Sequence, residues 1–352
     1  MSQDKHKVVV ALSGGVDSSA ATALLLEAEY DCQGVFMITS DQNRHAEVDA
    51  QQVAQRLGIE LTVLDLREQF AEILKYFFDT YCKGLTPNPC VVCNRTIKFG
   101  KLWDFAKERE ADFLATGHYA RILNDGDGQA GLYQGASLAK DQSYVLSMVD
   151  RKVLSHVLLP LGEHSKDQAR QIARKLDLGT DTKAESQEIC FIPDDDYVAL
   201  LEQHHPELVR KGPIVDSAGK VLGTHQGIHR YTIGQRRGLR VAMGKPYYVT
   251  RLDADANTVV LGPKEEVMHN GLSTGKVNWL IDPPSEPFSG TVKIRYNDRG
   301  KPATIFPDED GVRVAFDEPN LAITPGQLAV FYIEQDARQR VAGAGWIERI
   351  ND

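Results

Sequence analysis

Near its N-terminus the chain reads Val8-Val-Val-Ala-Leu-Ser-Gly-Gly-Val-Asp-Ser-Ser-Ala20: an apolar run, a glycine turn with hydroxyls, and the start of a helical stretch. Glycines let a backbone approach a phosphate without a Cβ clash, and the N–H groups of the turn and of the helix N-terminus point at the charge. The spacing matches neither a Walker A loop nor the Gly-x-Gly-x-x-Gly dinucleotide fingerprint. The stretch therefore predicts an anion cradle at the end of a strand.

Strand-like and helix-like stretches alternate from Lys7 to about Ala120. Such alternation implies right-handed crossovers and a parallel sheet that is buried on both faces. Ligands of these sheets bind beyond the carboxyl ends of the strands, where the glycine turn lies. The predicted strands are Val8–Leu12, Cys32–Ile38, Leu61–Leu64 and Phe113–Thr116, and the predicted helices are Ser19–Glu29, Glu47–Leu57 (ended by Gly58), Arg67–Tyr81 and Phe99–Glu110.

The pattern changes in the rest of the chain. The turn signal Asn124–Gly128 predicts a hairpin at Ala120–Gly135, inserted in the first domain. Beyond about His204–Pro213, short strands recur between Gly, Pro, Asn and Asp turns, which predicts small β-domains, the last of them a barrel. We expect domains at 1–205, 206–270 and 271–352. Helices are predicted at Gln142–Met148, Arg151–Leu158 and Lys166–Leu176, and strands at Gly212–Leu222, Tyr247–Arg251, Thr258–Leu261, Gly290–Tyr296, Gly311–Phe316, Leu328–Ile333 and Gly343–Ile347.

Composition and charge limit the class of protein. The chain has 352 residues, a net charge of −9 and five cysteines, and no apolar run approaches the ~20 residues that span a bilayer. Without an apolar signal segment or a disulfide framework, we expect a cytoplasmic protein with no membrane contact. The negative charge argues against indiscriminate nucleic-acid binding, although Thr224–Lys245 and Lys293–Lys301 are locally basic. Charge alone favours a solvated surface for both stretches.

Two cysteines form a Cys-x-x-Cys motif in Thr86-Pro-Asn-Pro-Cys-Val-Val-Cys-Asn94. The spacing suits zinc, a redox dithiol or an iron–sulfur cluster, and two incidental thiols at a helix start are the alternative. Cys190, about a hundred residues downstream, is by sequence alone compatible with a buried core thiol. Cys32 lies inside an apolar strand, which predicts a core position, and Cys82 has no motif around it.

Two other predicted strands end in residues suited to a nucleotide. In Ala115-Thr-Gly-His-Tyr119, Gly117 would let a nucleotide lie close over the sheet edge. His118 beside it is placed to contact a phosphate or a base. Met37, at the end of the second strand, is placed to pack on an adenine, although a core methionine fits the same pattern.

Together these segments resemble the tRNA-specific 2-thiouridylases, which replace the C2 oxygen of the wobble uridine with sulfur. The glycine loop alone is shared with other enzymes that split ATP between the α- and β-phosphates, but the ordered set is specific. The resemblance implies an α/β N-terminal domain of the PP-loop ATP pyrophosphatase type with a parallel sheet, a small β-rich central domain and a C-terminal β-barrel. The matching stretches are Ser13–Ser19, Thr86–Asn94, Ile97–Phe99, Ala115–Tyr119, Lys140–Tyr144, Ile189–Ile192, Gly223–Gly227, Tyr231–Leu239 and Thr324–Gln327.

The resemblance also implies a chemistry. The uridine O2 attacks the α-phosphorus of ATP, pyrophosphate leaves, and AMP becomes the leaving group at C2. Cys190 matches the family's persulfide carrier and Cys93 its second catalytic cysteine, which closes a disulfide onto Cys190 as sulfur is released. Thiolates are the reactive forms, so this requires an electropositive site. The implied ATP-binding residues are Ser13, Gly14, Gly15, Val16, Asp17, Ser18, Ser19, Met37 and Gly117, with Mg²⁺ offsetting the phosphate charge.

The implied partners are tRNA and a sulfur donor, either a cysteine desulfurase or a sulfur-relay protein. The tRNAs for Lys, Glu and Gln are the family's substrates. The resemblance places the basic run Arg230–Lys245 in the tRNA-binding face, whereas charge alone favours a solvated surface for it. The residues matching positions that touch the target base or tRNA are Asn88, Pro89, Cys90, His118, Lys140, Asp141, Gln142, Arg295, Tyr296 and Gln327.

One departure from the family keeps two mechanisms open. Many members carry an aspartate where this chain has Cys90, so Cys90, Cys93 and Cys190 are also candidate ligands of a [4Fe–4S] cluster that delivers sulfide. We favour the persulfide route. A different PP-loop synthetase would explain the glycine loop but would leave the cysteines and the arginine-rich loop without a role. A non-catalytic RNA-binding or sulfur-carrier protein would bind tRNA without hydrolysing ATP.

Overall fold

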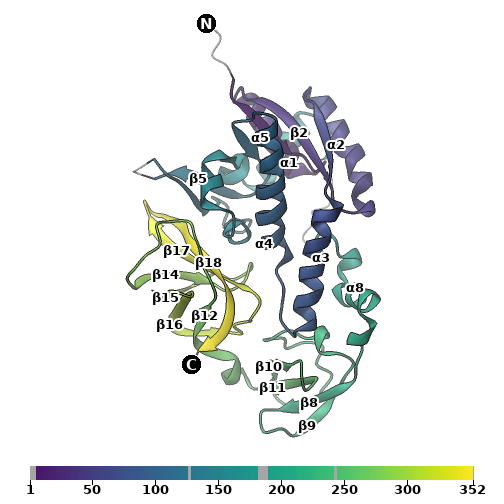
Figure 1. The fold of residues 1–352 in the computed structure, drawn as a ribbon, viewed down its shortest axis with the longest axis vertical. Coiled ribbons are helices and arrows are strands. Elements are labelled where there is room, and N and C mark those ends of the chain that lie inside the picture. Colours follow the sequence, from purple (N-terminus) through teal and green to yellow (C-terminus); the bar gives the residue numbers. More distant parts are fainter. Residues whose placement is uncertain (1–4, 126–127, 181–188, 242–243, 352) are drawn as a thin grey trace.

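The computed structural model describes residues 5–125, 128–180, 189–241 and 244–351. It has three parts, which Figure 1 shows as a parallel-sheet domain at the top, a barrel at the lower left and a small four-stranded sheet at the bottom. Helix α3 (Arg67–Cys82) and the long helix that begins with α4 (Pro89–Cys93) run side by side between them. The predicted fold class is confirmed.

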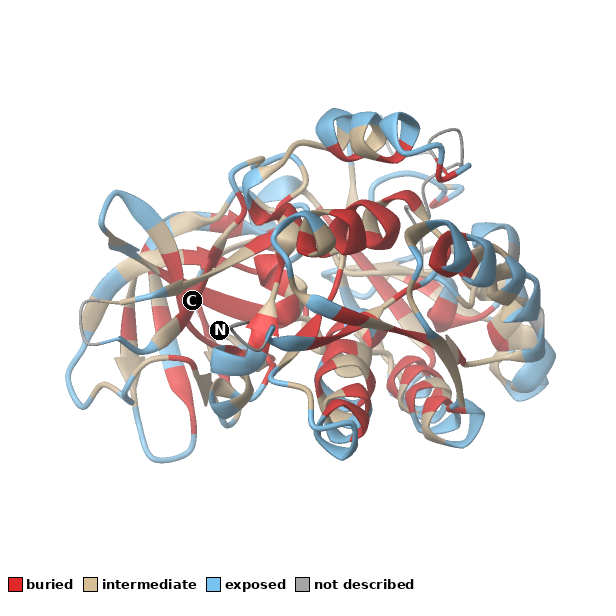
Figure 2. Cartoon of the chain, turned by 90° about the horizontal axis from the view of Figure 1, so that it is seen from above, coloured by how far each residue is buried: buried red, intermediate tan, exposed pale blue. Residues whose placement is uncertain are grey.

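The first part is a five-stranded parallel sheet in the order β3-β2-β1-β4-β7. Its central strand β1 is buried on both faces, which is why its valines form a continuous apolar run. Figure 2 shows the buried strands between helices whose outer faces are exposed. The strands are β1 (Lys7–Ala11), β2 (Asp31–Ile38), β3 (Leu61–Asp65), β4 (Phe113–Ala115) and β7 (Val157–Leu158), and the other helices of this part are α1 (Val16–Glu27), α2 (Arg44–Leu57), α5 (Leu102–Glu108), α6 (Ser143–Leu146), α7 (Lys166–Lys175) and α8 (Tyr197–His204).

Two details of this part differ from the sequence prediction. Residues 157–158, predicted as the end of a helix, form β7 because they pair with β4 at the sheet edge. The helix predicted from Phe99 begins at Pro89, ten positions earlier, and passes through a π-helical segment, Asn94–Lys101, into α5. Asn88 caps it by accepting a hydrogen bond from the N–H of Val91 at 3.4 Å, and proline occupies the first helical position, as is common at helix starts.

The second part is the small sheet β10-β11-β8-β9, and the third is a closed barrel. Strands pair in the order β12-β16-β15-β14-β17-β18, and β18 returns to β12, so six strands close on themselves. The strands are β8 (Gly212–Asp216), β9 (Val221–His225), β10 (Tyr248–Asp253), β11 (Thr258–Gly262), β12 (Met268–Thr274), β13 (Asn278–Trp279), β14 (Phe288–Lys293), β15 (Lys301–Pro307), β16 (Val312–Leu321), β17 (Leu328–Gln335) and β18 (Arg338–Asn351).

The predicted hairpin is present but belongs to a different sheet. It consists of β5 (Ala120–Asn124) and β6 (Ala130–Gln134), and the tip of its predicted turn lies outside the described residues. Tyr133 of β6 pairs with Arg340 of β18, so the hairpin extends the barrel sheet. The strand pairing therefore joins the N-terminal and C-terminal parts of the chain.

A second interface, the seam, joins the barrel to the segment that precedes α4. Gln327 Nε2 donates to the carbonyls of Thr86 and Pro87 at 3.2 and 2.9 Å. Tyr144 OH donates to the Leu328 carbonyl at 2.9 Å, and it is fully buried. The barrel thus fixes the backbone leading into the Cys-x-x-Cys motif.

We expect Gly326→Ala to destabilise this seam. Gly326 has a φ of +89°, and a Cβ there would lie 2.9 Å from the Thr86 carbonyl oxygen. Gly219 is the matched control, since its φ is +83° but nothing lies within 4 Å of its Cβ position. The overpacking adds about 1–3 kcal/mol of destabilisation beyond the shared backbone strain. Urea unfolding followed by tryptophan fluorescence measures it, and equal losses in the two variants would contradict a tight seam.

Candidate active site

The glycine turn between β1 and α1 is a preorganised loop. Ser18 Oγ accepts a hydrogen bond from the N–H of Ser13 at 3.1 Å, and Ser19 Oγ donates to the Gly15 carbonyl at 2.7 Å. Gly14 has a φ of +72°, and a Cβ there would lie 2.7 Å from Cβ of Asp49 on α2. Only glycine accepts both this conformation and this close approach. The loop lies at the N-terminus of α1, where backbone N–H groups and the helix dipole favour an anion.

The loop's acidic residue, Asp17, is held from two other segments. Tyr119 OH donates to Asp17 Oδ1 at 2.6 Å, and Lys166 Nζ lies 2.8 Å from both carboxylate oxygens. Tyr119 follows β4 and Lys166 begins α7, so these contacts connect the loop to both elements. Charge-assisted hydrogen bonds of this kind are about twice as strong as neutral ones.

The predicted nucleotide residues meet at the carboxyl edge of the parallel sheet. A Cβ at Gly117 would lie 2.7 Å from the carbonyl carbon of Asp17 and 2.8 Å from the N of Ser18. The end of β4 therefore packs against the first turn of α1. Met37, near the end of β2, is partly buried at the same edge, and its carbonyl accepts from Asn43 Nδ2 at 2.9 Å.

Cys190 is positioned by the aromatic residue that follows it. The ring centroid of Phe191 lies 5.6 Å from that of Phe70 and 5.2 Å from that of Phe77, and both partners are buried on α3. Helix α3 packs against α4, which carries the Cys-x-x-Cys motif. The thiol of Cys190 is electrostatically coupled to both motif thiols. The structure therefore brings together the three cysteines that the sequence analysis singled out, each in the reduced state.

Lys98 is a residue of this site that the sequence analysis did not assign. Its Nζ lies 3.4 Å from Nε2 of His118, and its charge acts on all three thiols. The residue stands in one of the matched stretches, Ile97–Phe99, so a signal was present. Its direction could not be read from the sequence, because α-helical periodicity turns it away from Cys93.

Burial dominates the proton equilibria of the thiols. It raises the pKa of Cys93 from its ordinary 9.0 to about 11, and Lys98 opposes this rise. Burial likewise raises the pKa of Cys90 and of Cys190, again with Lys98 opposing. Although Cys90 and Cys190 are exposed residues, enough protein surrounds their thiols that desolvation is the largest cause. At neutral pH the resting thiols are therefore mainly protonated.

His118 is buried and neutral. Burial and, to a lesser extent, Lys98 hold its pKa well below the ordinary 6.5. An ammonium group has only donors, so Lys98 donates to Nε2 and the His118 Nδ1–H donates to Thr116 Oγ1 at 2.7 Å. His118 thus links the end of β4 to the cysteine-bearing helix.

Several predicted tRNA contacts gather where the parallel-sheet domain meets the barrel. Asn88 Nδ2 donates to Gln327 Oε1 at 3.5 Å. Tyr296 is exposed, and the Cys90 thiol is one of the groups that act on its phenol. Arg295 donates to the Ala322 carbonyl at 2.6 Å.

The predicted contacts Lys140, Asp141 and Gln142 form a turn beside this junction. Asp141 is buried, accepts hydrogen bonds from the N–H groups of Gly135 and Ser143 at 3.0 Å, and lies 3.8 Å from Lys293. Gln142 Oε1 accepts from the N–H of Tyr119 at 2.9 Å. In the structure, Asp141 and Gln142 hold the turn in place.

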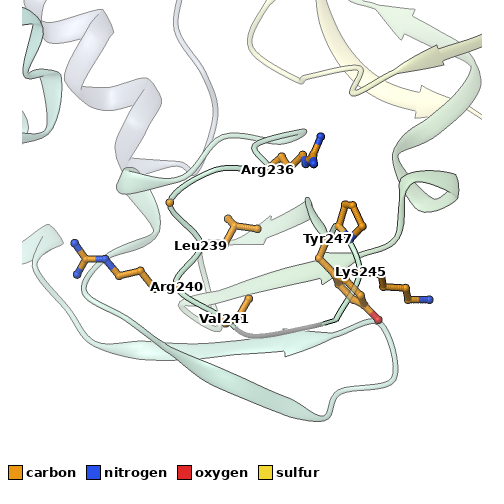
Figure 3. Close-up of a pocket in the computed structure, with 8 residues that line it drawn as sticks. Arg236, Leu239, Arg240, Val241, Lys245 and Tyr247 are labelled. Atoms are coloured by element: carbon orange, nitrogen blue, oxygen red, sulfur yellow. The ribbon is translucent and has the colours of Figure 1, made fainter.

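The basic stretch in the loop before β10 surrounds a pocket of about 260 Å³. Figure 3 shows Arg236, Arg240 and Lys245 around it, with their charged ends directed outward, and Lys245 Nζ lies 5.8 Å from the ring centroid of Tyr247. The three cations are exposed. Arg230, by contrast, forms an ion pair with Glu202.

Two kinds of site are absent from the described part of the chain. No group of three or more His, Cys, Asp or Glu residues there is arranged to hold a metal ion. Within the same residues, no helix is long and apolar enough to cross a membrane.

The fold and the loop define the class as an α/β nucleotide-binding domain followed by two β-domains. The family described as tRNA methyl transferase HUP domain matches residues 6–194. Residues 199–263 match a tRNA methyl transferase PRC-barrel domain, and residues 269–347 match an aminomethyltransferase β-barrel domain.

Similar proteins share nearly the whole chain. The tRNA-specific 2-thiouridylase MnmA of Carboxydothermus hydrogenoformans is 45% identical over 98% of this chain and 98% of its own. That of Magnetococcus marinus is 44% identical over 97% of this chain and 99% of its own. The chain belongs to the family of tRNA-specific 2-thiouridylases, which are tRNA sulfurtransferases, and the family prediction is confirmed.

A solved 4-thiouridine synthetase–RNA complex with bound ATP covers 57% of this chain and 51% of its own. The identity is 19% and the TM-score 0.38. This similarity is too weak to bear on the function.

The raised thiol pKa values predict slow alkylation of the folded protein at neutral pH. Since only the thiolate reacts and the pKa of Cys93 is about 11, its rate with iodoacetamide should keep rising with pH up to about 11. In the urea-unfolded chain the rate should level off above about 9. Mass spectrometry of quenched samples gives the rate at each cysteine. Identical profiles for folded and unfolded protein would show that burial does not control this thiol.

Proposed function

We propose that this protein uses ATP to replace the C2 oxygen of the wobble uridine in the tRNAs for Lys, Glu and Gln with sulfur, in the cytoplasm. One observation carries the proposal: Gly117 packs on the phosphate loop, and the next residue, His118, bonds to the lysine that is coupled to three thiols. A site for ATP and a site for sulfur chemistry are thus joined through two consecutive residues. Family membership supports the substrate.

The first step activates the base. The N–H groups of Ser13–Ser19 hold the phosphates, with Met37 and Gly117 beside the adenosine. Uridine O2 attacks the α-phosphorus, pyrophosphate leaves, and the N3 proton is released, which leaves C2 bonded to an AMP leaving group. Mg²⁺ would enter with ATP and be held mainly by phosphate oxygens, since Asp17 is the acidic residue of the loop.

The second step transfers sulfur. A persulfide on Cys190 is deprotonated, and its terminal sulfur attacks C2 and displaces AMP. The Cys93 thiolate then attacks the Cys190 sulfur, so the bond to the transferred sulfur breaks and a Cys93–Cys190 disulfide forms. A thiol reductant must return two electrons to reopen it. Alternatively, Cys93 attacks the Cys190 persulfide first and releases hydrosulfide, which then attacks C2. The products and the number of electrons to be returned are the same.

Substrate binding is assigned to two surfaces. Asn88, Pro89, Cys90, Arg295 and Tyr296 would hold the splayed-out base at the junction of domain and barrel, since RNA recognition of this kind reads an extruded base. His118, Lys140, Asp141, Gln142 and Gln327 line or support the same region, and the exposed arginines of the central sheet would contact the backbone. We assign these roles to domains at 1–205, 206–270 and 271–352. The sulfur donor is a cysteine desulfurase or a sulfur-relay protein.

A [4Fe–4S] cluster on Cys90, Cys93 and Cys190 is the alternative. Over the described residues these thiols are not arranged to hold a single metal ion, which gives a cluster no support. We therefore derive no step through one. Cys90→Ala separates the routes, because a persulfide enzyme loses only the contribution of this side chain to base binding whereas a three-thiolate cluster is lost.

We expect Cys190→Ala and Cys93→Ala to abolish thiolation of tRNA while tRNA-dependent pyrophosphate release persists, because the adenylating loop is untouched. Cys82→Ala is the control, being a thiol away from the motif. Thiolation is measured by mass spectrometry of digested tRNA with a persulfide donor, and iron content is measured on anaerobic samples. Pyrophosphate release driven by a carboxylate and ammonia, without tRNA, would instead indicate a synthetase. Iron that is lost together with activity in Cys90→Ala would establish the cluster route.

A further inference from the structure

Sulfur transfer places a negative charge on a sulfur atom, and the buried surroundings of the thiols disfavour that charge. Persulfide, hydrosulfide and thiolate are all anions, and burial disfavours an anion unless a cation or hydrogen bonds stabilise it. Lys98 is the cation whose charge acts on Cys90, Cys93 and Cys190 alike. Its side chain is partly buried, so solvent screens it less than a surface lysine.

The π-helical segment explains how this lysine reaches the thiols. Lys98 stands five residues after Cys93. In an α-helix, five residues correspond to a turn of about 140° beyond a full revolution, which would direct the lysine to another face. In a π-helix the hydrogen bond runs from i to i+5, which brings residues five apart nearer to the same face. The segment Asn94–Lys101 is π-helical, and such turns are frequent at functional sites.

His118 fixes the lysine in this position. Its Nε2 accepts from Lys98 Nζ at 3.4 Å, and Thr116 Oγ1 holds the opposite nitrogen at 2.7 Å. Because His118 is neutral, it orients the ammonium without neutralising its charge.

We infer that Lys98, oriented by His118, is the counter-ion of the sulfur anion during transfer, and that the π-helical turn serves to place it. This assignment rests on the proposed function and adds an electrostatic residue to it. His118 is then a positioning residue, in addition to any contact with tRNA. Sulfur attack, and not adenylation, is the step that depends on Lys98.

The test compares Lys98→Met with Lys98→Arg and with Lys101→Met. Lys101 lies on the same π-helical segment but is exposed, so its variant loses the same charge from the surface. The first readout is the iodoacetamide rate at Cys93 and Cys190 at fixed pH, without ATP or tRNA. The second is single-turnover thiolation, and the third is tRNA-dependent pyrophosphate release.

Loss of a nearby cation corresponds to about ten- to a hundredfold fewer thiolates. We expect Lys98→Met to slow alkylation and thiolation by that factor while pyrophosphate release persists. Lys98→Arg should retain most of both rates, and Lys101→Met should match the wild type in alkylation. His118→Gln should give a smaller loss, since the ammonium remains but loses its fixed acceptor.

Unchanged alkylation in Lys98→Met would overturn the inference, and so would equal losses in Lys98→Met and Lys101→Met. Loss of both rates in Lys98→Arg would indicate a packing role and would also overturn it. Thermal unfolding confirms that each variant is folded, and Lys98→Gln is measured in place of Lys98→Met if the latter is not. The alkylation measurement needs no substrate, so it stays valid even if the proposed function is wrong. A wrong function is detected separately, because the wild type would then not thiolate tRNA.

Discussion

The close approach of β4 to the first turn of α1 is the constraint on which the site depends. Gly117 lies where a Cβ would come within 2.7 Å of the Asp17 backbone, so the strand end and the glycine loop share one rigid position. The next residue, His118, bonds to Lys98 on the cysteine-bearing helix. Two consecutive peptide units therefore set the separation between the loop and the thiols. A larger residue at position 117 would move both halves of the site together.

The barrel helps to position the cysteine-bearing helix. Gln327 bonds to the two carbonyls that precede Asn88, and Asn88 in turn caps the helix carrying Cys90 and Cys93. On the other side, Phe191 packs between the rings of α3 and sets the position of Cys190. The thiols are thus positioned by elements that are far apart in sequence, which explains why single segments of this chain would not form the site.

The sequence predicted the elements whose structure depends mainly on residues that are neighbours in the chain. The strands Val8–Leu12 and Cys32–Ile38 were placed to within a residue or so because a strand buried on both faces needs a continuous apolar run. The glycine loop was recognisable because its backbone geometry demands glycine. The helix was predicted only from Phe99, and a helix start at the cysteine motif was one alternative among several, since the apolar motif lacks helical periodicity.

Other features depend on distant contacts that no local pattern records. Strand β7 exists through its pairing with β4, and the hairpin β5–β6 joins a strand some two hundred residues away. Lys98 belongs to the same class, because its direction follows from a π-helical turn that α-helical periodicity does not predict.

The charge distribution shows how an acidic protein can serve anionic partners. The net charge is −9, yet cations are placed locally: one ammonium near the thiols, one beside Asp17 and an exposed group in the loop before β10. Fields from distant surface carboxylates are screened over about 8 Å at physiological salt, whereas partly buried charges act with less screening. At these three places the local positive charge therefore outweighs the net negative charge of the chain.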